Sequence, residues 1–458
     1  MSGSTQGPDR IQFSDGPQQR QVKGGRLGKR RVPRSPLLAL PILVVVLLVT
    51  LVAVACGAGD PGDSRSAGAV SHRGSAFDSK VVNSGKVTQC PDPSQSGDLH
   101  VSGNQVLDSS SKPFTFYGVT VYGGLEDAGG RGETWQQGQA GSMAQIKAAV
   151  SWHANTIRLQ VGEGNAFNGA NPANGVNESF LAALCTQVRQ IRAQGMEAVI
   201  NDQTEWPDWN EYNPTARTEA FWKVMAQMFG NEPGVIFDLY NEPRLYYPVS
   251  LKVKPHQTIN AQWVWNTWRY GGYVDGQHFI GMQQLVDYVR GLKASNQIWV
   301  EGAFVDDSLG LMGKYMVTGS NLVVSLHHPQ LNGTAYWDKY FGYLTKTYPV
   351  VDGEWGQYAS NRPECRGNAY TMVPQYLRYL RAHGIGVLGW ALEPGAMLAD
   401  PAHTIPNNLS YQGQATDPRQ LLTPSTMSPN YRCDNNHLGQ GAGKLLLQQF
   451  QLYSHLAS

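Results

Sequence analysis

The sequence predicts a (β/α)8 barrel, because eight short strand-like runs alternate with stretches of helical length in one block of the chain. No glycine-rich phosphate loop follows the first run, which argues against an open nucleotide-binding sheet. A long uncharged apolar segment and a stretch rich in Gly, Ser, Asp and Pro precede the block. We therefore expect an N-terminal membrane or signal segment, a disordered linker and one barrel domain.

The N-terminal segment is typical of a chain directed to a membrane. Residues 1–36 are rich in Lys and Arg, and residues 37–56 form a run of twenty residues without a charge. As a helix, such a run spans about 30 Å, the thickness of the hydrocarbon core. Basic flanks stay on the cytoplasmic side. We expect a cytoplasmic tail over 1–36 and a transmembrane anchor or signal segment over 37–56.

Three fates of this segment remain open: a signal anchor, a cleaved signal peptide, and a lipoprotein signal that ends at Cys56. We favour a membrane tether, because the basic region is long for a signal peptide. Residues 57–95 contain few large apolar side chains and predict a disordered linker. The catalytic domain is expected over 96–458, outside the cytoplasm, either anchored to the membrane or secreted after cleavage.

Eight apolar and β-branched runs predict the barrel strands. They are residues 114–122, 155–161, 197–202, 235–241, 297–303, 321–328, 349–356 and 386–394. Apolar residues at three-to-four spacing predict helices over 178–194, 217–230, 278–294, 335–347, 368–383 and 440–455. In such a barrel, chemistry gathers where the strands end. Polar residues at the ends of the eight runs are therefore the candidates for a site.

Composition excludes several other classes of function. The formal net charge of +1 gives no support to nucleic-acid binding. Neither the pair His327–His328 nor the five cysteines show the spacing of a zinc site. No Gly-x-Ser-x-Gly elbow follows a strand. We expect a monomer with no metal, no cofactor and no nucleic-acid partner.

Two of the predicted strands end in a carboxylate. The fourth run closes in Asn241-Glu242-Pro243, and the seventh in Gly353-Glu354-Trp355. Glycoside hydrolysis needs one protonated carboxyl and one ionised carboxylate that face each other across the bound sugar. A second Asn-Glu-Pro, at 231–233, lies between a helix and a strand, so we expect it at the opposite end of the barrel.

An Asn-Glu-Pro that closes one strand and a Gly-Glu-Trp-Gly that closes another 112 residues later resemble glycoside hydrolase family 5, over about residues 100–458. The resemblance implies a cellulase-like, retaining enzyme with Glu242 as acid/base and Glu354 as nucleophile. It implies a β-linked polysaccharide or oligosaccharide as substrate, with β-glucan or cellulose foremost. For retention, the two carboxyls should lie about 5 to 5.5 Å apart.

The resemblance also assigns residues that bind the sugar or orient the catalytic pair. Asn241 corresponds to the residue that holds the sugar 2-hydroxyl, Arg158 to the one that orients the nucleophile, and His327 to the family's strand-six histidine. Trp390 corresponds to the tryptophan under the sugar at the cut. Other acidic residues near strand ends are expected to support substrate binding: Asp202, Glu205, Glu301 and Glu393.

The sequence departs from the family pattern at two places. Residues 201–206 lack the usual histidine after strand three. After strand six, the chain has His327-His328-Pro329 and lacks the tyrosine that hydrogen-bonds the nucleophile. Tyr336 or Tyr358 could replace that tyrosine, and the sequence does not decide between them.

Aromatic residues are dense after the acid/base strand, with three Trp and two Tyr in residues 263–273. Flat rings suit the apolar faces of sugars, although packing is the alternative role for any single ring. We expect a cleft with several sugar subsites, lined by some of Trp206, Trp209, Trp263, Trp265 and Trp268 and by Trp390 at the cut.

Four cysteines remain when Cys56 is set aside, and they allow three disulfide pairings. We favour Cys365 with Cys433, which fall in loops after late strands, and Cys90 with Cys185, which would fix the start of the domain to the second helix.

Two alternatives to hydrolysis stay open. A cell-wall transglycosylase would use the same fold and the same glutamates, and a non-catalytic barrel would bind carbohydrate without cleaving it. The sugar, its linkage and the choice between endo and exo action are not fixed by the sequence.

Overall fold

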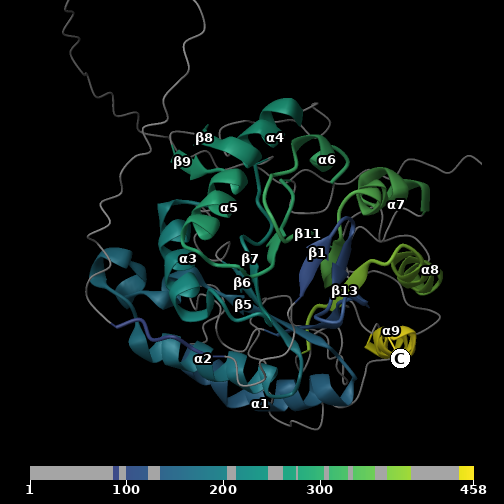
Figure 1. The fold of residues 1–458 in the computed structure, drawn as a ribbon, viewed down its shortest axis with the longest axis horizontal. Helices are drawn as coiled ribbons and strands as arrows, with labels where there is room; N and C mark the ends of the chain where they lie inside the picture. The colour runs from purple at the N-terminus through teal and green to yellow at the C-terminus, as the bar shows by residue number, and fades with distance from the viewer. Residues whose placement is uncertain are drawn as a thin grey trace, which may run out of the picture. The chain divides into compact units, whose positions relative to one another are not determined.

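The computed structural model describes residues 86–91, 99–121, 135–203, 213–245, 261–274, 277–303, 309–327, 334–355, 369–392 and 443–457. All of them belong to one unit, residues 73–458. At its centre, eight parallel strands close into a barrel surrounded by helices (Figure 1). The predicted (β/α)8 fold is confirmed.

Each barrel strand overlaps one of the eight predicted runs. In barrel order they are β4 (Tyr117–Val121), β5 (Thr156–Val161), β6 (Glu197–Asp202), β7 (Val235–Asp238), β10 (Ile298–Val300), β11 (Leu322–His327), β12 (Val350–Trp355) and β13 (Gly386–Gly389). β13 pairs with β4 and closes the barrel. The second Asn-Glu-Pro lies between α3 and the start of β7, at the end of the barrel away from Glu242, as expected.

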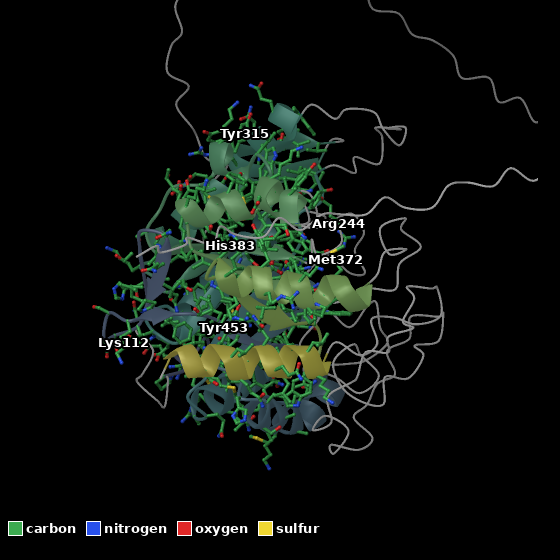
Figure 2. The ribbon with its side chains drawn as sticks, turned by 90° about the vertical axis from the view of Figure 1, so that its right-hand side faces the viewer. Lys112, Arg244, Tyr315, Met372, His383 and Tyr453 are labelled. Carbon is green, nitrogen blue, oxygen red and sulfur yellow. A yellow bond between two sulfur atoms is a disulfide. The ribbon has the colours of Figure 1, made fainter. Side chains whose placement is uncertain are left out.

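Six helices correspond to predicted ones. They are α2 (Glu178–Arg192), α3 (Ala216–Phe229), α5 (Met282–Gly291), α7 (Thr334–Tyr340), α8 (Ala369–Ala382) and α9 (Gly443–Ala457). Two have different bounds: residues 277–280 form a strand before α5, and Gly342–Lys346 form a 3-10 helix, η5, after α7. Figure 2 shows α8, which carries Met372, beside α9, which carries Tyr453. Tyr453 Oη donates to the carbonyl of Ile385, so α9 is tied to the start of β13.

Helix α2 illustrates why these segments fold as they do. Asn177 caps its N-terminus, because the side-chain oxygen accepts from the Phe180 N–H. Phe180, Leu184 and Val188 are buried, and their spacing of four residues gives one apolar face toward the barrel.

Several elements were not predicted from the sequence. The helices are α1 (Trp135–Ser151), α4 (Ala261–Tyr270) and α6 (Met312–Tyr315), and after β5 come the short 3-10 turns η1 (Glu163–Ala166), η2 (Asn168–Ala170) and η3 (Pro172–Asn174). The strands are β1 (His100–Ser102), β2 (Gln105–Leu107), β3 (Pro113–Phe114), β8 (Gly271–Val274) and β9 (Gln277–Ile280). Most are only two to four residues long, too short for a period to stand out.

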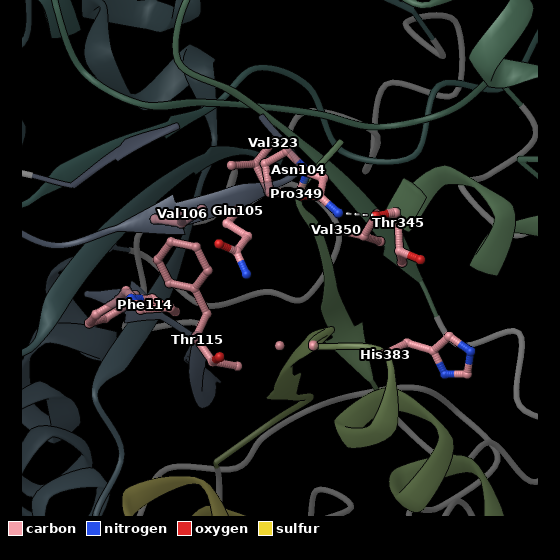
Figure 3. A pocket seen from close by; sticks show the side chains of 14 residues that line it. Asn104, Gln105, Val106, Phe114, Thr115, Val323, Thr345, Pro349, Val350 and His383 are labelled. Carbon is pink, nitrogen blue, oxygen red and sulfur yellow. Dashed lines mark hydrogen bonds between the residues drawn. The ribbon is translucent and has the colours of Figure 1, made fainter. Parts of the chain in front are cut away.

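The sheet β1–β3 lies at the end of the barrel where the strands begin. Leu99 and Val106 share an apolar cluster with barrel-interior residues such as Ile236, and Phe116 packs edge-on against Trp299 at 5.0 Å between ring centroids. Beside this sheet is a cavity of about 160 Å³, lined by residues of β2, β3 and the starts of β11–β13 (Figure 3). Apolar packing closes the barrel interior at this end, and the predicted site residues lie at the opposite ends of the strands.

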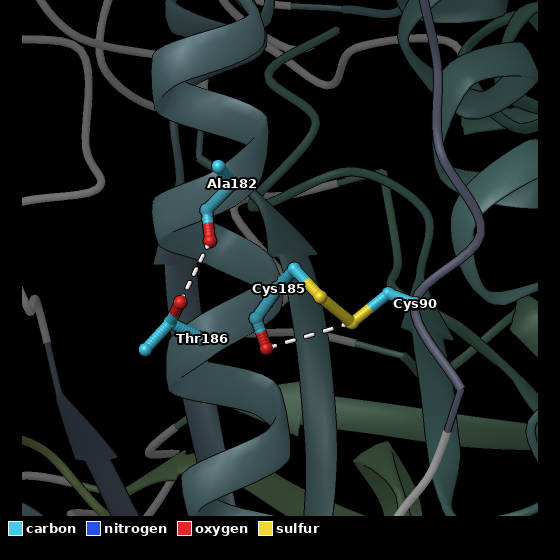
Figure 4. Close-up of a disulfide and its surroundings, with 4 residues drawn as sticks. All are labelled: Cys90, Ala182, Cys185 and Thr186. Atoms are coloured by element: carbon cyan, nitrogen blue, oxygen red, sulfur yellow. Dashed lines mark hydrogen bonds between the residues drawn. A yellow bond between two sulfur atoms is a disulfide. The ribbon is translucent and has the colours of Figure 1, made fainter.

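A disulfide joins Cys90 to Cys185 of α2, with 5.7 Å between the Cα atoms (Figure 4). This confirms one of the two predicted pairs. The second pair, Cys365 with Cys433, lies outside the described residues, as does the apolar segment 37–56. Among the helices in the described ranges, none is both long and apolar enough to cross a membrane.

Candidate active site

The acid/base candidate Glu242 follows β7 and has an unusual backbone. Its φ is 46°, in the left-handed region that non-glycine residues rarely adopt. Such a conformation costs about 1–3 kcal/mol and persists only where the surroundings hold it. Here the Glu242 N–H donates to Glu301 Oε2 at 2.6 Å, and the neighbouring Asn241 N–H donates to the Asp202 carbonyl at 2.9 Å. These two bonds direct the Glu242 side chain.

The nucleophile candidate Glu354 is turned into the barrel by a break in the register of β12. Leu326 pairs with Asp352, but the next residue of β11, His327, pairs with Glu354. Such a bulge lets two residues in sequence oppose one and re-aims the following side chain. Asp352 therefore points outward to the Tyr376 hydroxyl of α8 at 2.7 Å. Glu354 points inward, although it is two residues further along the strand.

Arg158, on β5, is fully buried and contacts the nucleophile candidate. Its Nη1 donates to Glu354 Oε2 at 2.7 Å, its Nε to Asp238 Oδ2 at 2.9 Å, and its Nη2 to Asn241 Oδ1 at 2.8 Å. Nη2 also donates to Glu301 Oε1 at 3.0 Å. Burial by itself lowers the pKa of Arg158, but the carboxylates of Asp238, Glu354 and Glu301 raise it overall. The guanidinium therefore keeps its charge.

His327, the last residue of β11, lies between the carboxylates. Its Nδ1 is 3.0 Å from Glu242 Oε1 and 3.9 Å from Glu354 Oε2, and its Nε2 is 3.3 Å from Glu301 Oε1. Burial lowers the pKa of this imidazole, but Glu301, Glu354 and the hydrogen bond to Glu242 together raise it well above the usual value. The ring is therefore positively charged near neutral pH.

Three carboxyls around these cations have shifted pKa values. Burial, together with the charge of Glu301, raises the pKa of Asp238 to about 8. Burial also raises the pKa of Glu301, but His327, Arg158 and the Glu242 N–H outweigh it, so the net shift is downward. For Glu354, burial is the largest cause and raises the pKa, with Glu242 and Glu301 adding to it against His327 and Arg158.

After the third barrel strand, β6, where the sequence lacks the family's histidine, the side chain of Gln203 pairs with that of Gln160. Gln160, on the same face of β5 as Arg158, donates from Nε2 to Gln203 Oε1 at 2.8 Å. The same nitrogen lies 3.4 Å from Glu354 Oε2. Of the two tyrosines considered for strand six, Tyr336 stacks on Tyr340 with 3.9 Å between centroids, and Tyr358 lies outside the described residues.

The aromatic cluster after the acid/base strand divides into two groups. Trp265 and Trp268 of α4 are buried, pack edge-on at 5.2 Å, and belong to the core around the barrel. Trp263 has 37% of its surface exposed. Packing is therefore the role of the first two rings, while Trp263 is open to a ligand. Trp206 and Trp209 lie outside the described residues.

Trp390 follows β13, and only 7% of its surface is exposed. The backbone N–H of Trp390 donates to the Trp355 carbonyl at 2.7 Å. Trp390 therefore lies next to the strand that carries Glu354. The structure thus brings together Glu242, Glu354, Arg158, Asn241 and His327, with Trp390 on the adjoining strand.

Sequence reasoning did not single out Asp238, Gln160 or Gln203, and it treated Glu301 only as a supporting residue. Asp238 and Arg158 stand on strands 80 residues apart in the sequence. The available signal was alternation: Gln160 is two residues after Arg158, so both face the barrel interior.

One group of donor atoms among the described residues converges closely enough to consider a cation. Oxygens of Glu242 and Glu354 and a nitrogen of His327 lie within 4.8 Å of one another. Arg158 already occupies Glu354 Oε2, and His327 Nδ1 is hydrogen-bonded to Glu242. With two cationic side chains against the carboxylates, the arrangement suits proton transfer better than metal binding.

The sequence matches the family model described as cellulase (glycosyl hydrolase family 5) over residues 107–396, more than half of the 458 residues. The chain belongs to glycosyl hydrolase family 5. The predicted membership of this family is thereby confirmed. The matched segment of the chain contains all the site residues discussed above.

Among curated relatives, Endoglucanase Z of Dickeya dadantii is 21% identical over 322 residues, which cover 69% of this chain and 64% of that protein. Endoglucanase MaCel5A of a Microbulbifer species is 23% identical over 306 residues, which cover 64% of this chain and 51% of that protein. The family 5 chain thus spans less than two thirds of either relative's length.

Among solved structures, the β-glucanase SdGluc5_26A of Saccharophagus degradans in complex with cellotetraose superposes with a TM-score of 0.55 at 18% identity. The alignment covers 82% of this chain and 98% of that one. The catalytic domain of Thermobifida fusca endoglucanase Cel5A gives a TM-score of 0.50 at 14% identity, covering 78% and 98%. These likenesses show that the family 5 enzyme shares their barrel fold.

Proposed function

We propose that this protein is a retaining endo-β-glucanase-like hydrolase that cleaves a β-linked glucan by double displacement, with Glu354 as nucleophile and Glu242 as acid/base. The proposal rests on the short distance between Glu242 and Glu354. Their side-chain oxygens lie within 4.8 Å of each other, at the end of the barrel where the strands end. Retaining enzymes place the two carboxyls about 5–5.5 Å apart, and inverting enzymes about 6.5–9.5 Å apart to admit a water.

The surroundings suit different tasks for the two carboxyls. Arg158 binds Glu354 Oε2 at 2.7 Å, which favours the ionised form that attacks the anomeric carbon. Glu242 gives its proton to the leaving oxygen and then takes one from the water that resolves the glycosyl-enzyme. His327, 3.0 Å from Glu242 Oε1, stabilises the carboxylate left after the first transfer.

Substrate binding is proposed from three kinds of residue. Asn241, whose side-chain oxygen accepts from Arg158, would bind the sugar 2-hydroxyl. Trp390, beside β12, would form the platform at the cut, and Trp206 would extend the binding wall. The names of the relatives, two endoglucanases and a β-glucanase with cellotetraose, favour a β-glucan over a mannan or xylan.

We also propose that the enzyme works outside the cytoplasm, tethered by its N-terminal segment or released after cleavage. The basic tail and the uncharged run at 37–56 support this. The buried disulfide between Cys90 and Cys185 supports it independently, because disulfides persist in oxidising compartments.

The test of the function uses the full-length protein, purified in mild detergent and incubated with a panel of β-glucans, mannans and xylans. We expect reducing ends from a β-glucan, and proton NMR should show the β-anomer as the first product. An α-anomer would contradict retention. Acceptor-dependent lengthening in place of hydrolysis would indicate a transglycosylase, and binding without cleavage of any polymer would indicate a carbohydrate-binding barrel.

A further inference from the structure

Glu301 directly follows β10 and is completely buried. A buried carboxylate is costly unless cations and hydrogen-bond donors surround it. Three groups of the site do so, and each belongs to a different strand or loop. They are the Glu242 N–H at 2.6 Å, Arg158 Nη2 at 3.0 Å and His327 Nε2 at 3.3 Å.

Each of these groups leads directly to one of the two reacting carboxyls. The Glu242 N–H fixes the backbone of the acid/base, which has the strained φ of 46°. Through its other nitrogen, His327 contacts Glu242 Oε1 at 3.0 Å. Through its other terminal nitrogen, Arg158 contacts Glu354 Oε2 at 2.7 Å. One carboxylate therefore contacts the Glu242 backbone, His327 and Arg158, which between them reach both glutamates.

We propose that Glu301 is a positioning residue that couples the two catalytic glutamates: it holds the acid/base by its backbone N–H and through His327, and it holds the nucleophile through Arg158. The inference rests on the proposed function of Glu242 and Glu354. The backbone carbonyl of Glu301 accepts from Trp268 Nε1 at 2.9 Å, which fixes the chain directly after β10. Glu301 would orient the two glutamates and keep a negative charge beside His327.

The second part of this task is to keep His327 protonated while Glu242 changes state. When Glu242 gives its proton to the leaving oxygen, the new carboxylate lies beside the His327 Nδ1–H, and the proton returns to Glu242 from the attacking water. His327 itself neither gains nor loses a proton. The charged groups that act on it are Glu301 directly after β10, Glu354 on β12, Asp238 on β7 and Glu242 in the loop that follows β7.

The variant that tests this is Glu301→Gln, which keeps the shape and one acceptor oxygen but removes the charge. Without the anion, His327 should release its proton at a lower pH. In ¹³C-histidine NMR of the full-length protein, with the signal assigned by its loss in His327→Asn, we expect the pKa of His327 to fall by about one unit or more. This readout does not depend on activity. A His327 titration that is the same in both proteins overturns the proposal.

Kinetics provide the second readout. On the polysaccharide identified by the activity screen, Glu301→Gln should lower kcat by about tenfold to a thousandfold, less than the full loss of acid/base catalysis, with KM changed less than about twofold. The alkaline limb of the rate profile should move to lower pH. On an aryl glycoside whose leaving group needs no proton, Glu301→Gln should lose less of its kcat than on the polysaccharide. An equal loss on both substrates, or a changed KM with kcat intact, contradicts the proposal.

Two further variants separate positioning from mere folding. Glu301→Asp keeps the charge but shortens the reach, so kcat should fall while the alkaline limb stays near that of the wild type. Glu197→Gln is the matched control, because Glu197 is also a buried barrel carboxylate paired with an arginine, Arg192 at 2.9 Å, at the opposite end of the barrel. It should lower stability without moving the pH profile. If Glu197→Gln moves the profile as Glu301→Gln does, the effect is structural and the proposal fails.

The outcomes also distinguish this inference from the proposed function. A wild-type protein without hydrolase activity on any substrate refutes the function, while the NMR titration still measures the link between Glu301 and His327. An active wild type with an unaffected Glu301→Gln variant refutes the inference alone.

Discussion

At the scale of single residues, the site works through differences in charge state between similar carboxyls. Four acidic side chains, Asp238, Glu242, Glu301 and Glu354, lie against three cations, Arg158, His327 and Arg244. Burial raises the pKa of both Asp238 and Glu354. Burial also raises the pKa of Glu301, but His327 and Arg158 outweigh it and lower that pKa overall.

The assignment of roles to Glu242 and Glu354 is tested by azide rescue. In Glu354→Ala, azide should attack an activated β-aryl glycoside directly and give the α-glycosyl azide, with inversion. In Glu242→Ala, azide should resolve the glycosyl-enzyme and give the β-glycosyl azide. Without azide, the kcat of each variant on polysaccharide should fall by about a hundredfold to ten-thousandfold. NMR of the glycosyl azide shows its anomeric configuration and so tests the two roles. If the two variants gave the opposite configurations, the roles of Glu242 and Glu354 would be reversed.

The acid limb of the pH profile should reflect Glu354. Its pKa is raised from the ordinary 4.5, mainly by burial. Because the nucleophile reacts only when ionised, kcat/KM should decline as pH falls through a value above 4.5, not at it. Inactivation by a 2-deoxy-2-fluoro glycoside, which also needs the ionised nucleophile, should follow the same limb. An acid limb at or below 4.5 in both measurements would contradict the assignment.

At the scale of the element, β12 decides where the nucleophile points. The register break between Asp352 and Glu354 turns one carboxylate toward α8 and the next toward the barrel axis. Gly353 lies at this break, and a Cβ placed there would overlap Ser325 Oγ on the adjacent strand. The glycine therefore leaves room for the Ser325 hydroxyl beside the residue that precedes Glu354 in the chain.

Gly353→Ala should lower stability modestly and leave activity close to that of the wild type. The added Cβ overlaps only the Ser325 hydroxyl, which has to rotate away, while the next atoms lie 3.6 Å and 3.7 Å from it. A side chain forced off its preferred rotamer costs about 0.5–1.5 kcal/mol. Calorimetry and steady-state kinetics measure the two effects. The control is Gly291→Ala at the end of α5, where no atom lies within 4 Å of the added Cβ. Equal stability of the two variants would show that the overlap with Ser325 is unimportant.

At the scale of the whole molecule, the disulfide joins the first described residues to the barrel. Cys90 and Cys185 are 95 residues apart, and the Cys90 N–H also donates to the Met228 carbonyl at 2.9 Å. Closing a loop of this length restricts the unfolded chain, which stabilises the folded one by roughly 2–4 kcal/mol. The chain before β1 is thereby fixed against α2 and α3.

Removing the disulfide should lower stability and leave catalysis intact. We expect Cys185→Ser, Cys90→Ser and the double variant to share one reduced Tm, because each breaks the same bond. At 25 °C their kcat should equal that of the wild type, since neither cysteine contacts the catalytic residues. Scanning calorimetry with and without reductant measures the effect. A Tm that is insensitive to reductant and to all three substitutions would show that the bond does not contribute.

The sequence by itself determined the eight strands and the position of both glutamates at strand ends, and it favoured the Cys90–Cys185 pair among three possible pairings. These follow from local signals: alternation of side chains, β-branched runs and motifs a few residues long. Tertiary structure decided the rest. The inward turn of Glu354 depends on a bulge between neighbouring strands, and Arg158 meets Glu354 across 196 residues of sequence. The packing role of Trp265 and Trp268 and the central place of Glu301 depend on side chains from distant strands and helices. No local pattern encodes such contacts, because barrel closure alone brings their partners together.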